Sequence, residues 1–223
     1  MGVVIAIDGP SGSGKSTVSR RVAQRLGLSY LDTGAMYRAV AWWCARQGVD
    51  LDDGKAVAEA AASIPLEVSM DPGRQEVLCD GEDITEAIRS SGLSKVVSKV
   101  ATNRRAREHL VKRQREIIDS ARYGIVAEGR DITTVVAPHA DVRVLLTASE
   151  EARLARRALQ VKGSADESAT AAMRDEVLRR DADDSTVVEF MKADAGVTTI
   201  DSSTLGIDDV VDAVVSLVPK DKR

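Results

Sequence analysis

The chain has 223 residues, of which 43% are hydrophobic, 30% are charged and 3% are aromatic. This length fits one α/β domain with a small insert better than it fits two equal domains. The formal net charge of −4 at pH 7 argues against a general nucleic-acid binder and against a protein of acidic membrane surfaces.

The cysteines predict a reducing compartment, and the hydropathy predicts a protein without membrane helices. The chain has two cysteines, Cys44 and Cys79, without a CxxC motif, so neither a disulfide framework nor a zinc site is expected. Cys44 lies in "AWWCARQ", which is typical of a buried helix face and predicts a core thiol. No apolar run approaches the ~20 residues of a membrane helix, and the N-terminus does not resemble a secretory signal. We therefore expect a cytoplasmic protein with no membrane partner.

The N-terminal elements alternate between strand and helix. The apolar run Val3–Asp8 predicts a strand that is covered on both faces, and Lys15–Leu26 carries apolar residues at helical spacing. "LSYLDTG" predicts a second short strand that ends at Asp32. Helices are expected at about residues 35–46 and in the alanine-rich "LDDGKAVAEAAASI".

The pattern changes between about residues 65 and 100. Apolar and polar residues alternate on both sides of Asp71-Pro72-Gly73, which predicts an antiparallel hairpin. A second turn at Asp80-Gly81 predicts a third short strand. We therefore expect a small insert with its own antiparallel sheet.

The strand–helix alternation then resumes. The expected elements are helices over residues 94–121 with a break at Thr102-Asn103, strands ending at Glu128 and near Thr147, helices over residues 150–161 and 167–180, a strand in "VTTIDSS", a helix over residues 208–218, and a frayed "PKDKR" tail. Such alternation implies an α/β fold, a P-loop nucleoside-triphosphate-hydrolase-like parallel sheet flanked by helices.

The segment "GPSGSGKS", residues 9–16, matches G-x-x-x-x-G-K-[ST] between a predicted strand and a predicted helix. Its glycines allow backbone N–H groups to surround an anion, and the helix N-terminus adds partial positive charge. Lys15 can reach the β- and γ-phosphates, and the Ser16 hydroxyl can ligate Mg²⁺. The expected ATP-binding residues are Gly9, Pro10, Ser11, Gly12, Ser13, Gly14, Lys15, Ser16 and Thr17.

GTP switches, motor ATPases and small-molecule kinases all use this loop. Asn103 is the only asparagine and lies in "NRRA", so the guanine motif N-K-x-D is absent, as is D-x-x-G. Motor ATPases are usually longer, and only "GIVAEG" resembles their acidic strand end. A kinase, in contrast, needs cationic groups around a second, acceptor site and exclusion of water.

Arginines from several segments meet that need. They are Arg38, Arg107, Arg130, Arg153, Arg156, Arg157, Arg179 and Arg180. Ligands of an open α/β sheet bind beyond the carboxyl ends of its strands, where Asp8, Asp32 and "EGRD" are expected. The basic stretch "NRRAREHLVKRQRE" is either a solvated helix face or an RNA-binding stripe, and the missing interleaved aromatics weaken the second alternative.

The chain also resembles the bacterial cytidylate (CMP/dCMP) kinases, a group of nucleoside monophosphate kinases. The segments that carry the resemblance are "IAIDGPSGSGKST", "YLDTGAMYRAVA", "DGEDITEAIRS", "VSKVATNRRAREHLVKRQR", "IVAEGRDITTVVAPHADVRVLLTAS", "RRDADDS" and "IDSSTLGIDDVV". They cover nearly the whole chain in family order. The resemblance implies transfer of the ATP γ-phosphoryl group to CMP or dCMP with Mg²⁺ as cofactor.

The resemblance also implies roles for individual residues. The implied CMP-binding residues are Thr33, Tyr37, Arg38, Ser98, Arg107, Arg130, Asp131, Arg180 and Asp184. Ser98, Arg107 and Asp131 match residues that read cytosine, Arg38 and Arg130 match arginines of the acceptor phosphate, and Arg180 and Asp184 match residues that face the ribose. Arg153, Arg156 and Arg157 match arginines of a mobile lid. Catalysis is assigned to Lys15, Arg130, Arg153 and Arg157.

Base chemistry agrees with the cytosine assignment. Cytosine offers an N4 amino donor that an aspartate can accept, whereas uracil has an acceptor there that a buried aspartate repels. Two positions depart from the family pattern. Val187 stands where an arginine is common, which puts one phosphate or ribose contact in doubt, and Glu128 stands where aspartate is common.

These observations predict a monomeric (d)CMP kinase of one domain, residues 1–223, with ATP and CMP or dCMP as its ligands. A core comprises about residues 1–33, 103–154 and 186–223, a CMP-binding region with the insert about residues 34–102, and a lid about residues 155–185. Two alternatives stay open: an RNA-associated P-loop ATPase, and a kinase for another acceptor such as UMP or shikimate.

Overall fold

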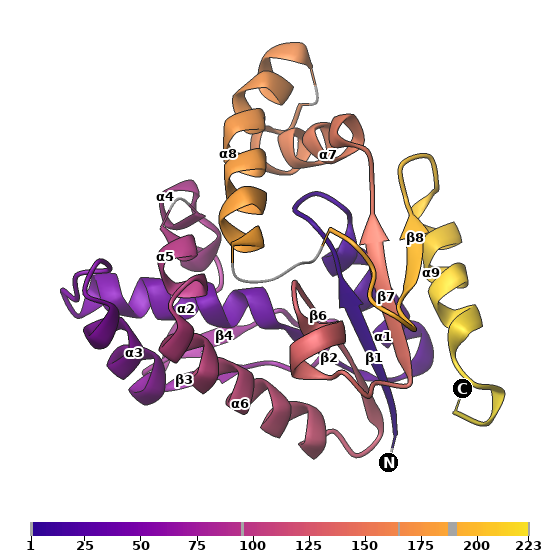
Figure 1. The fold of residues 1–223 in the computed structure, drawn as a ribbon, viewed down its shortest axis with the longest axis horizontal. Helices are drawn as coiled ribbons and strands as arrows, with labels where there is room; N and C mark the ends of the chain where they lie inside the picture. The colour runs from indigo at the N-terminus through magenta and orange to yellow at the C-terminus, as the bar shows by residue number, and fades with distance from the viewer. Residues whose placement is uncertain (1, 95, 165, 187–190, 223) are drawn as a thin grey trace.

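Five parallel strands form the central sheet of the computed structural model, which describes residues 2–94, 96–164, 166–186 and 191–222 (Figure 1). The strands are β1 (Val3–Asp8), β2 (Ser29–Asp32), β6 (Gly124–Gly129), β7 (Val142–Thr147) and β8 (Thr198–Asp201). Their order across the sheet is β2-β6-β1-β7-β8. Every pairing is parallel, for example Ile5 opposite Val126 and opposite Val142. The predicted parallel α/β fold is confirmed.

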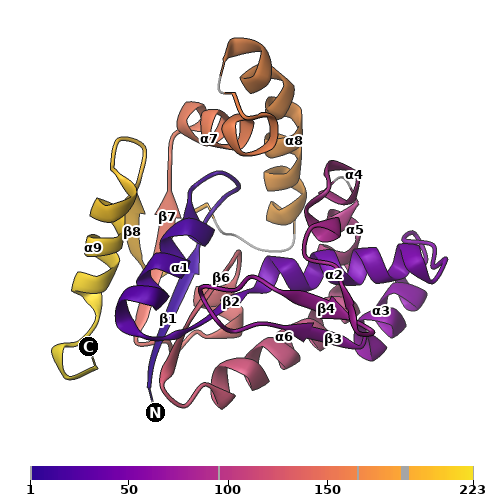
Figure 2. The ribbon, with the colours of Figure 1, turned by 180° about the vertical axis from the view of Figure 1, so that it is seen from behind.

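Helices cover both faces of this sheet. On one face, α1 (Lys15–Leu26) and α9 (Ile207–Leu217) pack against every second strand residue, such as Ile7 and Val126; Figure 2 shows α1 in front of β1. On the other face, α2 (Thr33–Arg46), α3 (Gly54–Ser63) and α6 (Arg104–Ser120) form a second apolar cluster with the alternate residues. This alternation follows from the two-residue period of a strand. Cys44 is fully buried there as a free thiol, as predicted.

The predicted insert and its antiparallel sheet are also present. It contains β3 (Leu66–Val68), β4 (Val77–Cys79) and β5 (Glu82–Asp83), followed by η1 (Ala87–Arg89), α4 (Ser91–Ser94) and α5 (Val97–Ala101). The second turn places Asp80 and Gly81 at positive φ, 52° and 75°. Arg113 of α6 donates hydrogen bonds to the carbonyls of Ile64 and Leu66, which attaches the insert to the main body.

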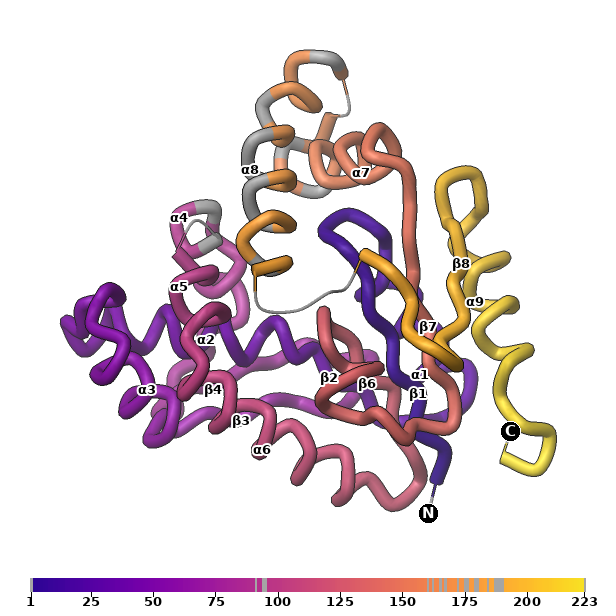
Figure 3. The backbone as a smooth tube through the Cα atoms, in the orientation of Figure 1, coloured from indigo at the N-terminus to yellow at the C-terminus, as the bar shows by residue number. Residues whose placement is uncertain are grey.

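A pair of helices, α7 (Glu150–Lys162) and α8 (Glu167–Ser185), stands beyond the carboxyl ends of β1 and β7 (Figure 3). The two helices pack together around a small cluster of Ala158, Ala169 and Met173. This cluster is separate from the two large clusters on the sheet. Polar contacts of the described residues join the α7–α8 pair to the phosphate-binding loop, as described below.

Several boundaries differ from the predictions for local reasons. Helix α2 begins at Thr33 instead of residue 35, because the Asp32 carboxylate caps it by accepting from Ala35 N at 2.9 Å. The predicted break before α6 is confirmed: Asn103 caps the helix at Ala106 N, 3.1 Å away. Helix α8 extends five residues beyond residue 180, to Ser185. The expectation of a frayed tail is wrong, because η3 (Lys220–Lys222) forms a turn and Lys222 Nζ lies 2.6 Å from Asp141 Oδ1.

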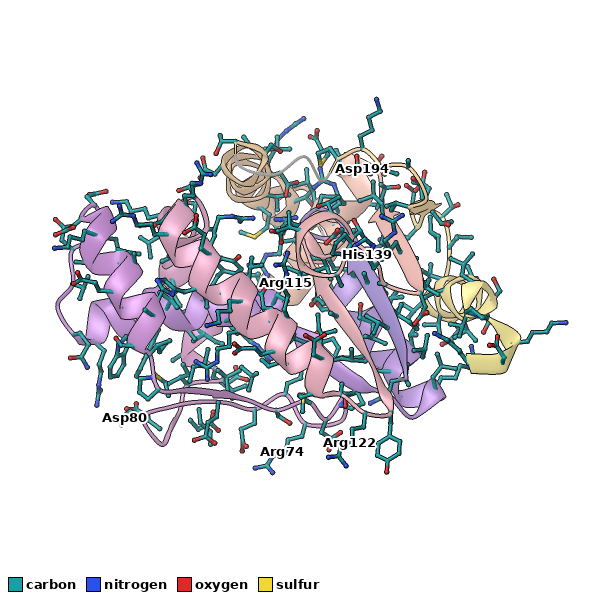
Figure 4. The ribbon with its side chains drawn as sticks, turned by 60° about the horizontal axis from the view of Figure 1, so that its bottom comes forward. Arg74, Asp80, Arg115, Arg122, His139 and Asp194 are labelled. Carbon is teal, nitrogen blue, oxygen red and sulfur yellow. The ribbon has the colours of Figure 1, made fainter. Side chains whose placement is uncertain are left out.

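The basic stretch on α6 serves largely structural contacts. Arg115, labelled in Figure 4, donates to the carbonyls of Val135 and Val136, which end the π-helical turn η2 (Ile132–Val136) after β6. Arg104 and Lys112 form i,i+4 ion pairs on the exposed face. These contacts favour the solvated face over an RNA-binding stripe. A search of the described residues finds no helix that is long and apolar enough to span a membrane.

Candidate active site

The phosphate-binding loop, residues 9–16, connects β1 to α1 at the carboxyl edge of the sheet. Gly12 and Gly14 have φ values of 77° and 90°, a region that side chains with a Cβ rarely adopt. A Cβ on Gly12 would also lie 2.5 Å from the carbonyl oxygen of Arg153. Lys15 Nζ donates to the carbonyl of Pro10 at 3.3 Å. Glycine is therefore required at Gly12 on two independent grounds.

The loop forms one wall of a cleft of about 630 Å³. The cleft lies beyond β1, β2 and β6, as expected for an open α/β sheet. The predicted site residues that line it are Ser11, Gly12, Lys15, Ser16, Thr17, Thr33, Tyr37, Arg38, Arg107, Arg130, Asp131 and Arg157. Residues more than a hundred positions apart in the sequence thus line one space, which both the loop and the predicted acceptor residues border.

Glu128 joins the loop to the end of β6. Ser16 Oγ donates to Glu128 Oε1 at 2.5 Å, and the Tyr30 hydroxyl donates to the same oxygen at 3.1 Å. Glu128 is 2% exposed, and its burial, reinforced by the charge of Asp32, raises the pKa of its carboxyl. Lys15 and the two hydroxyl donors oppose that rise in pKa. The result is a buried carboxylate directly beside the loop serine.

Asp32 shows the opposite shift. Burial raises its pKa, but Arg38, the Ala35 N–H and Lys15 outweigh that effect and hold the pKa below its usual value. Arg38 Nη2 lies 2.8 Å from Asp32 Oδ2. The pKa values of these neighbouring carboxyls are therefore shifted in opposite directions, that of Asp32 downward and that of Glu128 upward. Such a separation of pKa values is often found at functional sites.

Asp8, expected among the residues at the strand ends, turns away from the cleft. Its carboxylate accepts from Ile132 N and Thr133 N, both at 2.8 Å, and from Thr133 Oγ1 at 2.6 Å. It is 2% exposed, and burial outweighs these bonds to raise its pKa to about 6. Asp8 thus fixes the turn that follows Arg130 and Asp131.

Two of the predicted base-reading residues, Arg107 and Asp131, line the same cleft. Arg107 forms an ion pair with Asp131, and its guanidinium lies 6.0 Å from the centroid of the Tyr37 ring. Thr33 Oγ1 donates to the carbonyl of Glu128 at 2.8 Å. Ser98, on α5, does not line the cleft, although its helix neighbours Val97 and Ala101 do.

The predicted arginines of α7 differ in their surroundings. Arg157 lines the cleft. Arg153 is 5% exposed and does not line the cleft. It donates to Ser11 O at 3.1 Å and pairs with Asp181. Arg156 donates to Ser13 O at 3.3 Å and to Ser202 O at 2.6 Å, and so connects the loop to the segment that follows β8. The side chains of Arg180 and Asp184, on α8, and all of Val187 lie outside the described part of the chain.

The sequence predictions omitted several residues that line the cleft. Gln75, Glu86 and Arg89 reach it from the insert, and Arg20 reaches it from α1. Arg89 Nη2 donates to Gln75 Oε1 at 2.5 Å. The signal for Arg89 was its place in "DGEDITEAIRS", a segment quoted for the resemblance without a role for its arginine.

The fold has a counterpart among solved structures. An uncharacterized protein from Eubacterium ventriosum superposes with a TM-score of 0.54 at 11% identity and covers 99% of both chains. At that identity the likeness concerns the fold alone.

Sequence relatives are far more similar. A cytidylate kinase of Cutibacterium acnes is 49% identical over 218 residues, which cover 97% of this chain and 96% of the relative. A cytidylate kinase of Rhodococcus jostii is 49% identical over 220 residues, which cover 97% and 94%. The family model described as cytidylate kinase matches residues 5–220, which span the loop, the insert and the α7–α8 pair. The chain is therefore a member of the cytidylate kinase family.

Proposed function

We propose that this protein transfers the γ-phosphoryl group of ATP to CMP or dCMP, giving ADP and CDP or dCDP. The observation that carries the proposal is that Lys15 of the loop and the Arg107–Asp131 pair line one and the same cleft. A kinase needs a triphosphate and an acceptor side by side, and this cleft offers cationic groups for both. The relatives named cytidylate kinases support cytidylate as the acceptor.

Asp131 and Arg107 would read the base. The Asp131 carboxylate would accept from the N4 amino group of cytosine, and Arg107 would donate to its O2 or N3, with the Thr33 hydroxyl in support. Ser98, which does not line the cleft, would need a shift of α5 to take part. Uracil carries an oxygen where cytosine carries N4. Because Asp131 is 3% exposed, its carboxylate could not turn to water to avoid that oxygen, so UMP should be a poor acceptor.

Arg38 and Arg130 would bind the acceptor phosphate, and Tyr37 would line that subsite. An oxygen of this phosphate attacks the γ-phosphorus in line, and the oxygen bridging the β- and γ-phosphorus atoms leaves with ADP. Lys15 and Arg157, which line the cleft, would neutralise the charge on the transferring group, and Arg153, which is buried behind the loop, would support them by holding Ser11. Arg180 and Asp184 are proposed for the ribose. Catalysis is then positioning and charge neutralisation without a covalent enzyme intermediate.

Mg²⁺ is the proposed cofactor, and the donors present suit it. The Ser16 hydroxyl and the Glu128 carboxylate are hard oxygen donors 2.5 Å apart, and Mg²⁺ prefers oxygen ligands from protein, phosphate and water. When bound, the ion would neutralise charge on the β- and γ-phosphates. Glu128 is one methylene longer than the aspartate common at this position, and its carboxylate contacts the loop serine.

The domain division into core, CMP-binding region and lid belongs to the same proposal. The α7–α8 pair would close over the cleft as the lid and exclude water. We propose a monomer without nucleic-acid or membrane partners, because one chain supplies both sides of the cleft. The free, buried Cys44 and Cys79 support a reducing, cytoplasmic location.

One assay tests the proposal. Purified enzyme with Mg²⁺ and ATP is offered CMP, dCMP, UMP, shikimate or RNA, while ADP release and the phosphorylated product are both measured. CMP and dCMP should give stoichiometric diphosphate and ADP, and Lys15→Ala should remove most turnover while the circular dichroism spectrum stays unchanged. ATP hydrolysis that RNA stimulates and CMP does not affect would instead establish the ATPase alternative.

A further inference from the structure

Asp181 of α8 is a buried carboxylate at the contact between the α7–α8 pair and the phosphate-binding loop. It is 6% exposed, and its Oδ1 accepts from Ser11 N at 3.1 Å. The same oxygen lies 3.1 Å from Arg130 Nη2, and Oδ2 pairs with Arg153 Nη1. One carboxylate thus contacts the loop, the arginine after β6 and the arginine of α7.

The two arginines extend this contact to the loop carbonyls. Arg130 Nη1 donates to Gly9 O at 2.9 Å, and Arg153 Nη1 donates to Ser11 O at 3.1 Å. Each guanidinium is therefore held between Asp181 and a backbone oxygen of the loop. Such charge-assisted bonds fix both the position and the plane of a guanidinium.

Burial makes Asp181 important to both arginines. The side chains of Arg130 and Arg153 are 15% and 6% exposed, so little water is available to replace a lost anionic partner. Removing one member of a buried ion pair leaves the other charge uncompensated, and that group then changes position. Because the α7–α8 cluster is separate from both large core clusters, such a change should act locally on the site and leave the sheet folded.

We propose that Asp181 is a positioning residue of the phosphoryl transfer, which holds Arg130 and Arg153 against the loop in the orientation that the phosphates require. This inference rests on the proposed roles of the two arginines. Asp181 would thereby link the position of the α7–α8 pair to the binding of the acceptor phosphate and of the transferring phosphoryl group. Misplacing a group that contacts the reacting phosphates by about 1 Å can cost on the order of 100-fold in rate.

The primary test is Asp181→Asn, which keeps the shape and an acceptor for Ser11 N but removes the charge. Its kcat/KM for CMP at saturating Mg²⁺-ATP should fall about 10- to 100-fold. Asp183→Asn is the matched control, because it removes the same charge from the same helix at a residue that does not line the cleft. Its kcat/KM should stay within about twofold.

A double-mutant cycle separates positioning from general stability. If Asp181 acts through Arg130 and Arg153, Asp181→Asn should cost less in the Arg130→Met background than in the wild type, because only the part that acts through Arg153 remains. Multiplied losses in the double variant would overturn the proposal, as would wild-type kcat/KM in Asp181→Asn or a value above wild type. Thermal unfolding followed by circular dichroism checks that each variant is folded. Should Asp181→Asn not fold, Asp181→Glu, which shifts the charge by one methylene, enters the same cycle with the same expected coupling. Inactivity of the wild type toward CMP would count against the proposed function instead, so the two failures are distinct.

Discussion

Ser16 Oγ of the phosphate-binding loop donates a 2.5 Å hydrogen bond to Glu128 Oε1 at the end of β6. The bond joins residues 112 positions apart and places a buried carboxylate beside the hydroxyl that is proposed to ligate Mg²⁺. The tertiary structure therefore gives Glu128 a specific neighbour, which the strand-end motif "EGRD" leaves undefined.

Glu128→Gln should lower kcat about 10- to 100-fold and raise the Mg²⁺ concentration that gives half-maximal rate. Glutamine can still accept from Ser16 and Tyr30, but it lacks the charge that favours a cation. Titrating Mg²⁺ at fixed ATP and CMP measures both effects. Glu116→Gln, on the exposed face of α6, is the charge-matched control. An unchanged Mg²⁺ dependence in Glu128→Gln would remove Glu128 from the proposed metal site.

Asp131→Ala should reduce the preference for CMP over UMP. The carboxylate both accepts from cytosine N4 and repels uracil O4, so its loss should weaken CMP use by about 1–3 kcal/mol and relieve the repulsion of UMP. Asp131→Asn should favour UMP further, because an amide can donate to O4. The ratio of kcat/KM for CMP to that for UMP is the measurement. A ratio equal to that of the wild type would show that Asp131 does not read the base.

Arg157→Ala should lower kcat by about 10- to 1000-fold with a small change in thermal stability, because Arg157 lines the cleft and is proposed to act on the transferring phosphate. Arg174→Ala is the control. Arg174 lies on α8 and pairs with Glu150 on the exposed side, where an ion pair contributes little. Coupled ADP release at saturating substrates gives kcat for both variants. Equal rates would assign Arg157 a role outside the chemical step.

Gly12→Ala should impair the loop more than the backbone angle alone explains. Gly12 and Gly27 both have positive φ, 77° and 66°, but a Cβ meets Arg153 O only at Gly12 and meets nothing within 4 Å at Gly27. Gly27→Ala should therefore cost about 1–2 kcal/mol of unfolding free energy and leave the KM for ATP unchanged. Gly12→Ala should raise that KM as well. Identical KM values in the two variants would contradict the steric argument.

Asp8 should make stability depend on pH in an unusual direction for an aspartate. Its pKa is raised from 3.8 to about 6 in the folded chain, so the folded state binds more protons between those values. Its contribution to the free energy of unfolding is fully present below pH 4 and is lost as the pH rises through 6. The contribution changes by about 3 kcal/mol over this range.

Urea unfolding of the wild type and of Asp8→Asn at pH 4.5, where most of the contribution remains, and at pH 7, where it is lost, isolates the contribution of Asp8. The stability of the wild type relative to Asp8→Asn should be smaller at pH 7 than at the lower pH. A difference that does not vary with pH would mean that the carboxyl of Asp8 has an ordinary pKa.

The sequence by itself was sufficient for the features that depend on neighbouring residues. The loop motif, residues 9–16, is contiguous, and its glycines Gly12 and Gly14 adopt positive φ values. All five strands were predicted, Val3–Asp8 from its apolar run, and the Asn103 side chain caps the start of α6 at the predicted break. Short-range sterics and hydrogen bonds determine such features, so a local pattern contains the necessary information.

Only the tertiary structure decided which charged side chains share an environment. Asp8 meets Ile132 across 124 positions and turns from the cleft, and Arg153 meets Asp181 across 28 positions and is buried behind the loop. The sequence placed Asp8 at the end of a predicted strand and Arg153 in a predicted helix, but it could not select their partners. Burial and pairing depend on which elements pack together. The free-energy cost of removing a charge from water is offset only by a partner that the folded chain brings within a few ångströms.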